Sequence, residues 1–71
     1  MIAIFETNID CPRMARMIIK SLLWQREHLK VTLALDDEDK ILRVEGPLFE
    51  KEEIIAYLNY IGFRCTYLPI E

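Results

Sequence analysis

The sequence has few of the residues that build linkers, disulfide scaffolds or membrane spans. Only two glycines, three prolines and two cysteines occur among 71 residues, so a second domain or a disulfide framework has no compositional support. No apolar run approaches the roughly 20 residues that a membrane-spanning helix needs. The opening MIAIFE lacks the basic segment of a signal peptide. We therefore expect one cytoplasmic domain over residues 1–71, without membrane insertion.

Positive net charge and catalytic patterns are also missing. The formal charge is -3 at pH 7, whereas a nucleic-acid-binding domain normally carries a basic patch, so we expect no nucleic-acid partner. The single histidine, His28, has no cysteine or carboxylate at a convincing ligand spacing, and no Ser/His/Asp set or glycine-rich phosphate loop occurs. We therefore expect a protein that is not an enzyme. Its composition, 52% hydrophobic and 30% charged, is typical of a folded soluble domain.

Hydrophobic periodicity predicts six elements in the order strand, helix, strand, strand, helix, strand. The expected strands cover residues 2–7, 30–36, 40–46 and 64–70. The expected helices cover residues 11–25 and 49–63. The first has a wide apolar stripe at positions 14, 15, 17, 18, 19, 22 and 23, and the second has one at positions 54, 55, 58 and 61, so we expect both stripes to pack on a sheet. Two βαβ crossovers joined by a hairpin at the acidic run DDED give an α+β, ferredoxin-like βαββαβ sandwich. We predict a four-stranded antiparallel sheet in the order 4-1-3-2, with both helices on one face.

The helix ends carry boundary signals. Asp10 or Cys11 can serve as the N-cap of the first helix, and Pro12 suits its first turn because the missing N–H is not needed there. Gly62 is expected at the position that ends the second helix. In the predicted topology, the loop with Cys11 lies beside the loop with Gly62 and Phe63.

Cys11 is the first candidate for chemistry. A thiolate at a helix N-terminus is stabilised by the helix dipole, which lowers the pKa of the thiol and makes the sulfur a better ligand or nucleophile. Met14 follows three positions later, where a second cysteine would complete a soft-metal clamp. A purely structural interpretation is also consistent with the pattern, because a methionine on the first turn of an amphipathic helix usually fills the core and Cys11 can be a small capping residue.

The run Asn8-Ile9-Asp10-Cys11-Pro12-Arg13-Met14, followed later by Gly62-Phe63, resembles the heavy-metal-associated domain family of copper chaperones and transport-ATPase modules. That family has Gly-Met-x-Cys-x-x-Cys at this loop and Gly-Tyr or Gly-Phe before the last strand. The resemblance covers nearly the whole chain and implies a metal site at Cys11 and Met14, with a surrounding loop formed by Asp10, Pro12, Gly62 and Phe63. Met14 replaces the second cysteine. A thiolate with a thioether suits Cu(I) or another soft ion, and suits Zn(II) poorly.

The resemblance also implies partners. In that family the first helix often docks partner domains by charge complementarity, which here gives a docking face of Arg13, Arg16 and Lys20. The implied partners are a metal-transport ATPase or another heavy-metal-associated domain. The alternative interpretation is that these three basic side chains are simply solvated and bind no partner. The second helix begins with Glu50, Glu52 and Glu53, and this separation of charge favours self-association or steered docking.

Cys65 and the aromatic residues each admit two interpretations. If Cys65 faces the helices it is a small core residue, and otherwise it is a third metal ligand or a redox partner of Cys11. Trp24, Tyr57 and Tyr60 either mark an interface or cover the edges of the core.

Two functions therefore stay open. In the first, Cys11 and Met14 bind Cu(I) weakly in one chain, or as a homodimer in which two chains supply two thiolates and two thioethers. In the second, the same scaffold is free of metal and acts as a protein-interaction or self-association module.

Overall fold

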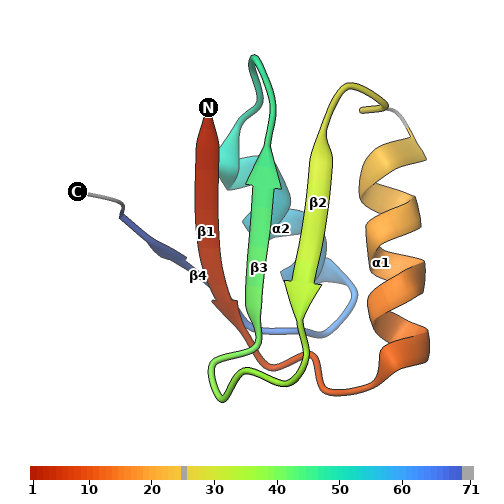
Figure 1. The fold of residues 1–71 in the computed structure, drawn as a ribbon. Helices are drawn as coiled ribbons and strands as arrows, with labels where there is room; N and C mark the ends of the chain where they lie inside the picture. Colours follow the sequence, from red (N-terminus) through yellow and green to blue (C-terminus); the bar gives the residue numbers. More distant parts are fainter. Residues whose placement is uncertain (25, 70–71) are drawn as a thin grey trace.

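The elements follow one another in the predicted order. A computed structural model describes residues 1–24 and 26–69 of the chain. Its elements are β1 (Ile2–Thr7), α1 (Pro12–Trp24), β2 (Lys30–Ala34), β3 (Ile41–Glu45), α2 (Lys51–Tyr60) and β4 (Cys65–Leu68) (Figure 1). Each lies inside its predicted range and most are shorter than predicted. The predicted ends at residues 25 and 70 fall outside the described residues.

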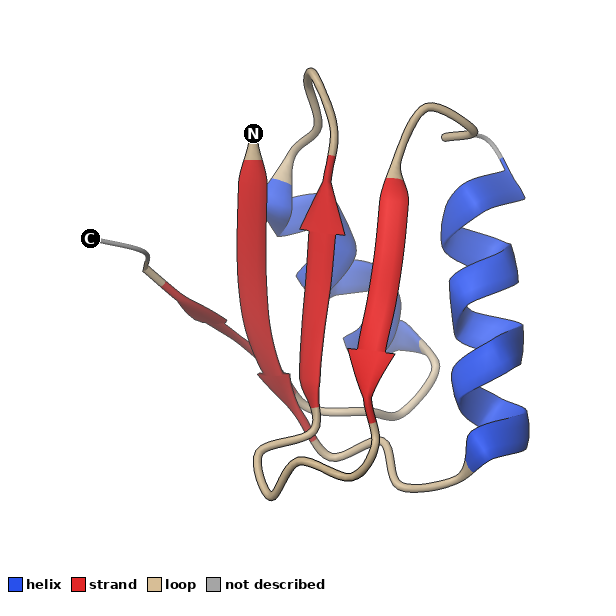
Figure 2. Ribbon diagram, viewed as in Figure 1, coloured by secondary structure: helices blue, strands red, loops and turns tan. Residues whose placement is uncertain are grey.

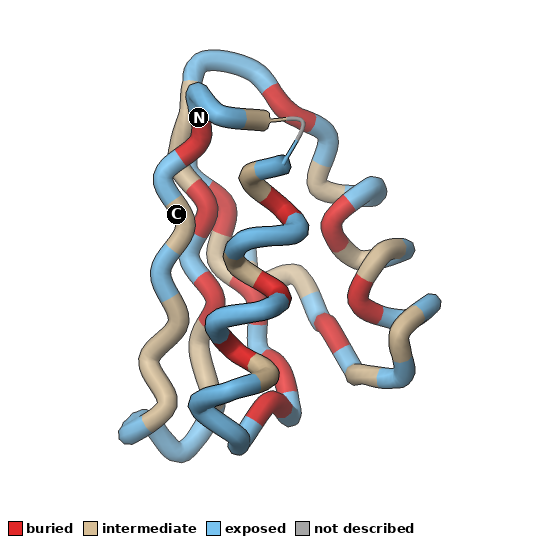
Figure 3. The backbone as a smooth tube through the Cα atoms, turned by 90° about the vertical axis from the view of Figure 1, so that its right-hand side faces the viewer, coloured by how far each residue is buried: buried red, intermediate tan, exposed pale blue. Residues whose placement is uncertain are grey.

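The four strands form one antiparallel sheet. Its order is β2-β3-β1-β4, which is the predicted 4-1-3-2 read from the other edge (Figure 2). Phe5 of β1 is paired with Leu42 on β3 and with Tyr67 on β4. Both helices cover the same face of the sheet (Figure 3). The ferredoxin-like α+β fold expected from the periodicity is therefore confirmed.

The core lies between the sheet and the helices because the strands alternate. On β1 and β3, the side chains that face the helices are buried, and they include the fully buried Phe5, Leu42 and Val44. The helices add Ile18, Leu22, Ile54 and Leu58, each at most 1% exposed. Burying an aliphatic or aromatic side chain of this size contributes about 1.5–3 kcal/mol. This shared core fixes the orientation of both helices.

One part of the predicted α1 stripe is wrong. Met17 was grouped with the apolar side chains that pack on the sheet, but it is 54% exposed. It lies on the side of the helix opposite Leu22, since five residues at 100° each turn the chain by about 140° beyond one full turn. Trp24 and Tyr60 are also exposed and do not cover the core, whereas Tyr57 is half-buried against it.

The helix ends match their sequence signals. The carbonyl of Cys11 accepts a hydrogen bond from Ala15 N (2.9 Å), which makes Cys11 the N-cap, and Pro12 is the first helical residue. At the end of α2, Gly62 N donates to Asn59 O (3.1 Å) and Phe63 N donates to Leu58 O (2.8 Å). These two bonds form a Schellman motif, and Gly62 has the positive φ of 101° that the motif requires.

Candidate functional site: the loop between β1 and α1

Thr7 and Ile9 anchor this loop from inside the molecule. The hydroxyl of Thr7 donates to Lys40 O (2.7 Å), and Thr7 N donates to Asp39 O (3.2 Å), so the end of β1 is tied to the tip of the β2–β3 hairpin. Ile9 N in turn donates to Thr7 Oγ1 (3.3 Å). The side chain of Ile9 is completely buried. Ile9 is thus an apolar plug beneath the loop.

Asn8 joins this loop to the one between α2 and β4. Its Oδ1 accepts a hydrogen bond from Arg64 N at 2.8 Å. The bond places the neighbours of Cys11 beside those of Gly62 and Phe63, as the topology predicted. Phe63 is half-buried against the core and Gly62 is exposed. The two loops therefore form one fixed platform at the start of α1.

Cys11 presents its thiol on the outside of that platform. The residue is exposed and forms no disulfide. Hydrogen bonding by the backbone N–H of Met14, and then of Arg13, lowers the pKa of the Cys11 thiol below its ordinary value, with a smaller contribution from the Arg13 charge. The carboxylate of Asp10 opposes the shift. These N–H groups lie in the first turn of α1 and have no partner within the helix, so the sulfur caps them best as a thiolate.

Met14 lies at the boundary between the outside and the core. It is half-buried, whereas Asp10, Cys11 and Pro12 before it are exposed and Ala15 after it is buried. Its thioether is neutral, so it can add a soft lone pair to a site at Cys11 without adding charge. One chain thus brings at most one thiolate and one thioether to this loop.

Cys65 belongs to the core. It is 8% exposed, and its pairing with Thr7 directs it toward the helices, so the interpretation as a small core residue is confirmed. Burial raises the pKa of the Cys65 thiol to about 11. Within residues 1–24 and 26–69, no three His, Cys, Asp or Glu side chains are grouped so that they could hold a metal ion. A role for Cys65 as a third ligand beside Cys11 and Met14 stays a prediction.

The predicted docking face on α1 contains more than its three basic residues. Arg13, Arg16 and Lys20 are all exposed. Met17 and Trp24 lie among them, and Lys20, Leu23, Trp24 and Glu27 line a shallow hollow. The spacing of positions 13, 17, 20 and 24 repeats every three or four residues, which is the signal that could have placed both apolar side chains on this face.

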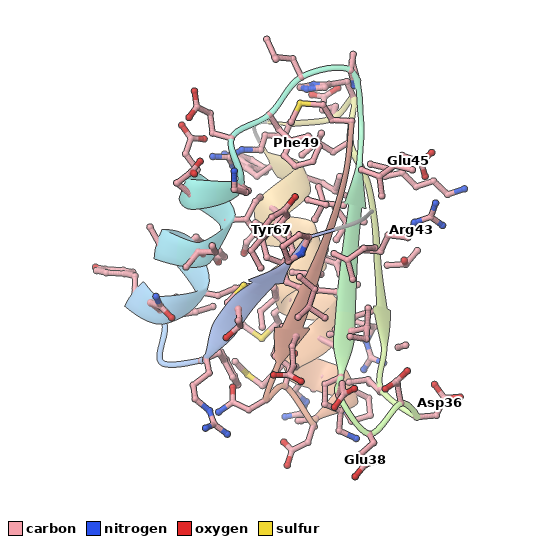
Figure 4. All side chains as sticks on the ribbon, turned by 90° about the vertical axis from the view of Figure 1, so that its left-hand side faces the viewer. Asp36, Glu38, Arg43, Glu45, Phe49 and Tyr67 are labelled. Atoms are coloured by element: carbon pink, nitrogen blue, oxygen red, sulfur yellow. The ribbon has the colours of Figure 1, made fainter. Side chains whose placement is uncertain are left out.

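A second hollow lies at the hairpin end of the sheet and was not predicted. It has a volume of about 230 Å³ and is lined by Glu6, Thr7, Glu38, Asp39, Arg64 and Thr66. Figure 4 shows Asp36 and Glu38 at the hairpin tip, and Arg43 and Glu45 on the sheet face away from the helices. The hollow is polar and lies at the tip that anchors Thr7.

Comparisons of the chain with protein-family models, with curated proteins and with solved structures give no match. The ferredoxin-like fold is compatible with the heavy-metal-associated family. Among the described residues, no helix is both long and apolar enough to cross a bilayer.

Proposed function

We propose that the chain binds a soft metal ion, Cu(I) in the first instance, with the Cys11 thiolate as the main ligand and Met14 as a weaker one. The observation that carries the proposal is the exposed Cys11 sulfur at the start of α1, where backbone N–H groups lower its pKa. A thiolate is the form of cysteine that binds metals. The loop beneath it is already fixed by Ile9 and Asn8, so little ordering is needed on binding.

The donor set favours a soft ion over a hard or intermediate one. Thiolate and thioether ligands select Cu(I), whereas structural Zn(II) sites normally take four nitrogen or sulfur ligands. The proposal agrees with the resemblance of this loop to heavy-metal-associated domains, with Met14 at the position of their second cysteine. A second chain that contributes its own Cys11 would complete a site of two thiolates.

An anaerobic Cu(I) titration against a competing chelator tests the proposal. We expect Cys11→Ser to abolish binding and Met14→Leu to weaken it several-fold, since leucine keeps the volume of methionine but lacks the sulfur. Met17→Leu is the matched control, because it removes an exposed methionine one turn away and should leave the affinity unchanged. Wild-type affinity no higher than that of Cys11→Ser would refute the proposal.

The metal-free alternative is supported by a different observation. Trp24 and Met17 are exposed on a helix side that also carries three cations, and such side chains are enriched at protein interfaces. A chain that fails to bind Cu(I) would therefore still have a surface built for contacts.

A further inference from the structure

The helices carry half of the strongly exposed large apolar side chains that the structure describes. Among residues 1–24 and 26–69, six large hydrophobic side chains are strongly exposed. Three of them belong to the helices, namely Met17 (54%), Trp24 (80%) and Tyr60 (88%), and the others are Met1, Ile2 and Leu48. Scattered exposed apolar residues are ordinary, but a group on one layer of a small domain indicates an interface.

The outer face of α1 is basic. We define it as the exposed side of the helix opposite Ile18 and Leu22, formed by Arg13, Arg16, Met17, Lys20 and Trp24. These positions lie within about 100° of one another around the helix axis. The helix contains no acidic residue, so this face carries three positive charges around two large apolar side chains.

The outer face of α2 carries acidic side chains in its first turn and a small side chain at its centre. We define it as the exposed side opposite Ile54 and Leu58, formed by Glu52, Glu53, Ala56, Asn59 and Tyr60. Ala56 occupies the middle of this face and leaves room for a larger side chain from a partner. The two outer faces therefore complement each other in charge and in size.

The fold presents the two outer faces side by side. Both helices lie on one side of the sheet (Figure 3), and they run antiparallel because each returns along the antiparallel strands β1 and β3 (Figure 1). Arg26, which follows α1 in the chain, forms an ion pair with Glu53 in the first turn of α2 (3.1 Å). A second copy that faces this layer therefore meets one basic and one acidic helix.

We propose that two copies of the chain associate through their helix layers, with α1 of each copy lying along α2 of its partner. A twofold axis parallel to the helices creates this unlike pairing twice and closes the assembly as a dimer. The twofold axis at right angles would instead place α1 on α1, with three cations against three. Repulsion between like charges thus selects the first arrangement.

The pairing also uses the apolar side chains. Met17 faces the part of the partner that contains Ala56, and Lys20 faces the part that contains Glu52 and Glu53. Trp24 supplies a large, rigid anchor of the kind that dominates binding energy at protein interfaces. Charge at the rim then fixes the orientation of the two copies.

The mixture of charge favours a second copy over other occupants. An anionic membrane or a uniformly acidic partner that covers α1 would also approach Glu52 and Glu53 on the neighbouring helix. A second copy satisfies both helices at once. Within the chain, Glu52 pairs with Lys51 (3.4 Å) and Glu53 pairs with Arg26 (3.1 Å), but such exposed ion pairs are weak, so both carboxylates stay available to the cations of a second copy.

Sedimentation equilibrium with reductant and a Cu(I) chelator tests the proposal. We expect the mass to rise from 8.4 kDa toward twice that value as the concentration increases. Emission from Trp24, the single tryptophan, should shift to shorter wavelength in parallel. Cys11→Ser should associate like the wild type, which separates this dimer from one bridged at Cys11.

Charge-reversal variants test whether α1 of one copy pairs with α2 of the other. Arg16→Glu/Lys20→Glu and Glu52→Lys/Glu53→Lys should each weaken association by roughly tenfold or more, because like charges then face each other. An equimolar mixture of the two variants should restore the dimer, since each basic helix again meets an acidic one. Arg43→Glu, on the far face of the sheet, is the matched control and should leave the mass unchanged. Circular dichroism checks that every variant is folded.

Three results would overturn the proposal: a wild-type chain that stays monomeric, a dimer that charge reversal leaves intact, or a mixture that does not reassociate. A monomer whose Trp24 emission shifts with phosphatidylserine vesicles or with an acidic polypeptide would also overturn it, and would assign the helix layer to that occupant.

Discussion

The two cysteines show how the fold can shift the pKa of the same type of side chain in opposite directions. Cys11 lies in the loop that starts α1, exposed, and its pKa is lowered by backbone N–H groups of the first turn. Cys65 lies across from Thr7 on β4, buried, and its pKa is raised to about 11 by removal from water. A thiolate is favoured at the first position and a neutral thiol at the second. Reactivity and ligand character therefore belong to the position, not to the residue type.

The same contrast divides the β1–α1 loop itself. Ile9 is completely buried, and Asp10 next to it is exposed. The inner residues of the loop connect to the core and to the hairpin, and the outer ones face solvent around Cys11. The buried Thr7 and Ile9 thus anchor this short segment, whereas Cys11 faces solvent, so substitutions can change the stability of the fold and the chemistry at Cys11 separately.

Removing the plug at Ile9 should have the largest effect. We expect Ile9→Ala to lower the free energy of unfolding by about 2–5 kcal/mol, because it deletes buried methylene groups and leaves a cavity. Asp10→Ala is the matched control and should change that free energy by less than about 0.5 kcal/mol, as is usual for an exposed position. Urea denaturation followed by circular dichroism measures both. Equal losses in the two variants would contradict the division of the loop into an inner and an outer side.

Serine substitution at the two cysteines should have a smaller effect. Cys65→Ser places a hydroxyl in the core, and burial of a polar group without a compensating hydrogen bond costs about 1–3 kcal/mol. Cys11→Ser should leave the unfolding free energy within about 0.5 kcal/mol of the wild type or raise it slightly, since serine is a favourable N-cap. If Cys11→Ser proved the more destabilising of the two, the assignment of Cys65 to the core would be wrong.

The sequence predicts the architecture well where periodicity is strong. The β-rich run of residues 2–7 and the alternation in residues 40–46 both indicate strands, and Phe5 and Val44 are buried on the face that meets the helices. The cap at Cys11 and the helix end at Gly62 follow from local chemistry, namely an open first turn and a positive φ. Such features depend on neighbours in sequence, so a single chain reveals them.

Features that depend on partners far along the chain were harder to predict. Alternation along the strand places the side chains of Cys65 and Thr66 on different faces of the sheet. Only the pairing of Cys65 with the buried Thr7 shows which of the two side chains faces the helices. Met17 was placed in the buried stripe because a count of apolar residues does not distinguish a wide stripe from two separate faces. The hydrogen bond between Asn8 and Arg64 joins residues 56 positions apart, and it could not be predicted from the residues around either of them.

The smallest effect concerns reactivity, and it tests the two cysteines directly. Because the folded pKa of Cys11 is lowered, its thiolate stabilises the fold above the ordinary pKa, and that contribution is lost as pH falls through the lowered value. The rate of iodoacetamide modification at Cys11 should therefore reach half its maximum at a lower pH than for the unfolded chain. Cys65 should react only after denaturation, because it is buried and protonated at neutral pH. Mass spectrometry of digested samples assigns each modification, and Cys65→Ala should leave the Cys11 profile unchanged. A Cys11 midpoint equal to that of the unfolded chain would mean that the first turn of α1 does not favour the thiolate, and the proposed soft-metal site would lose its main support.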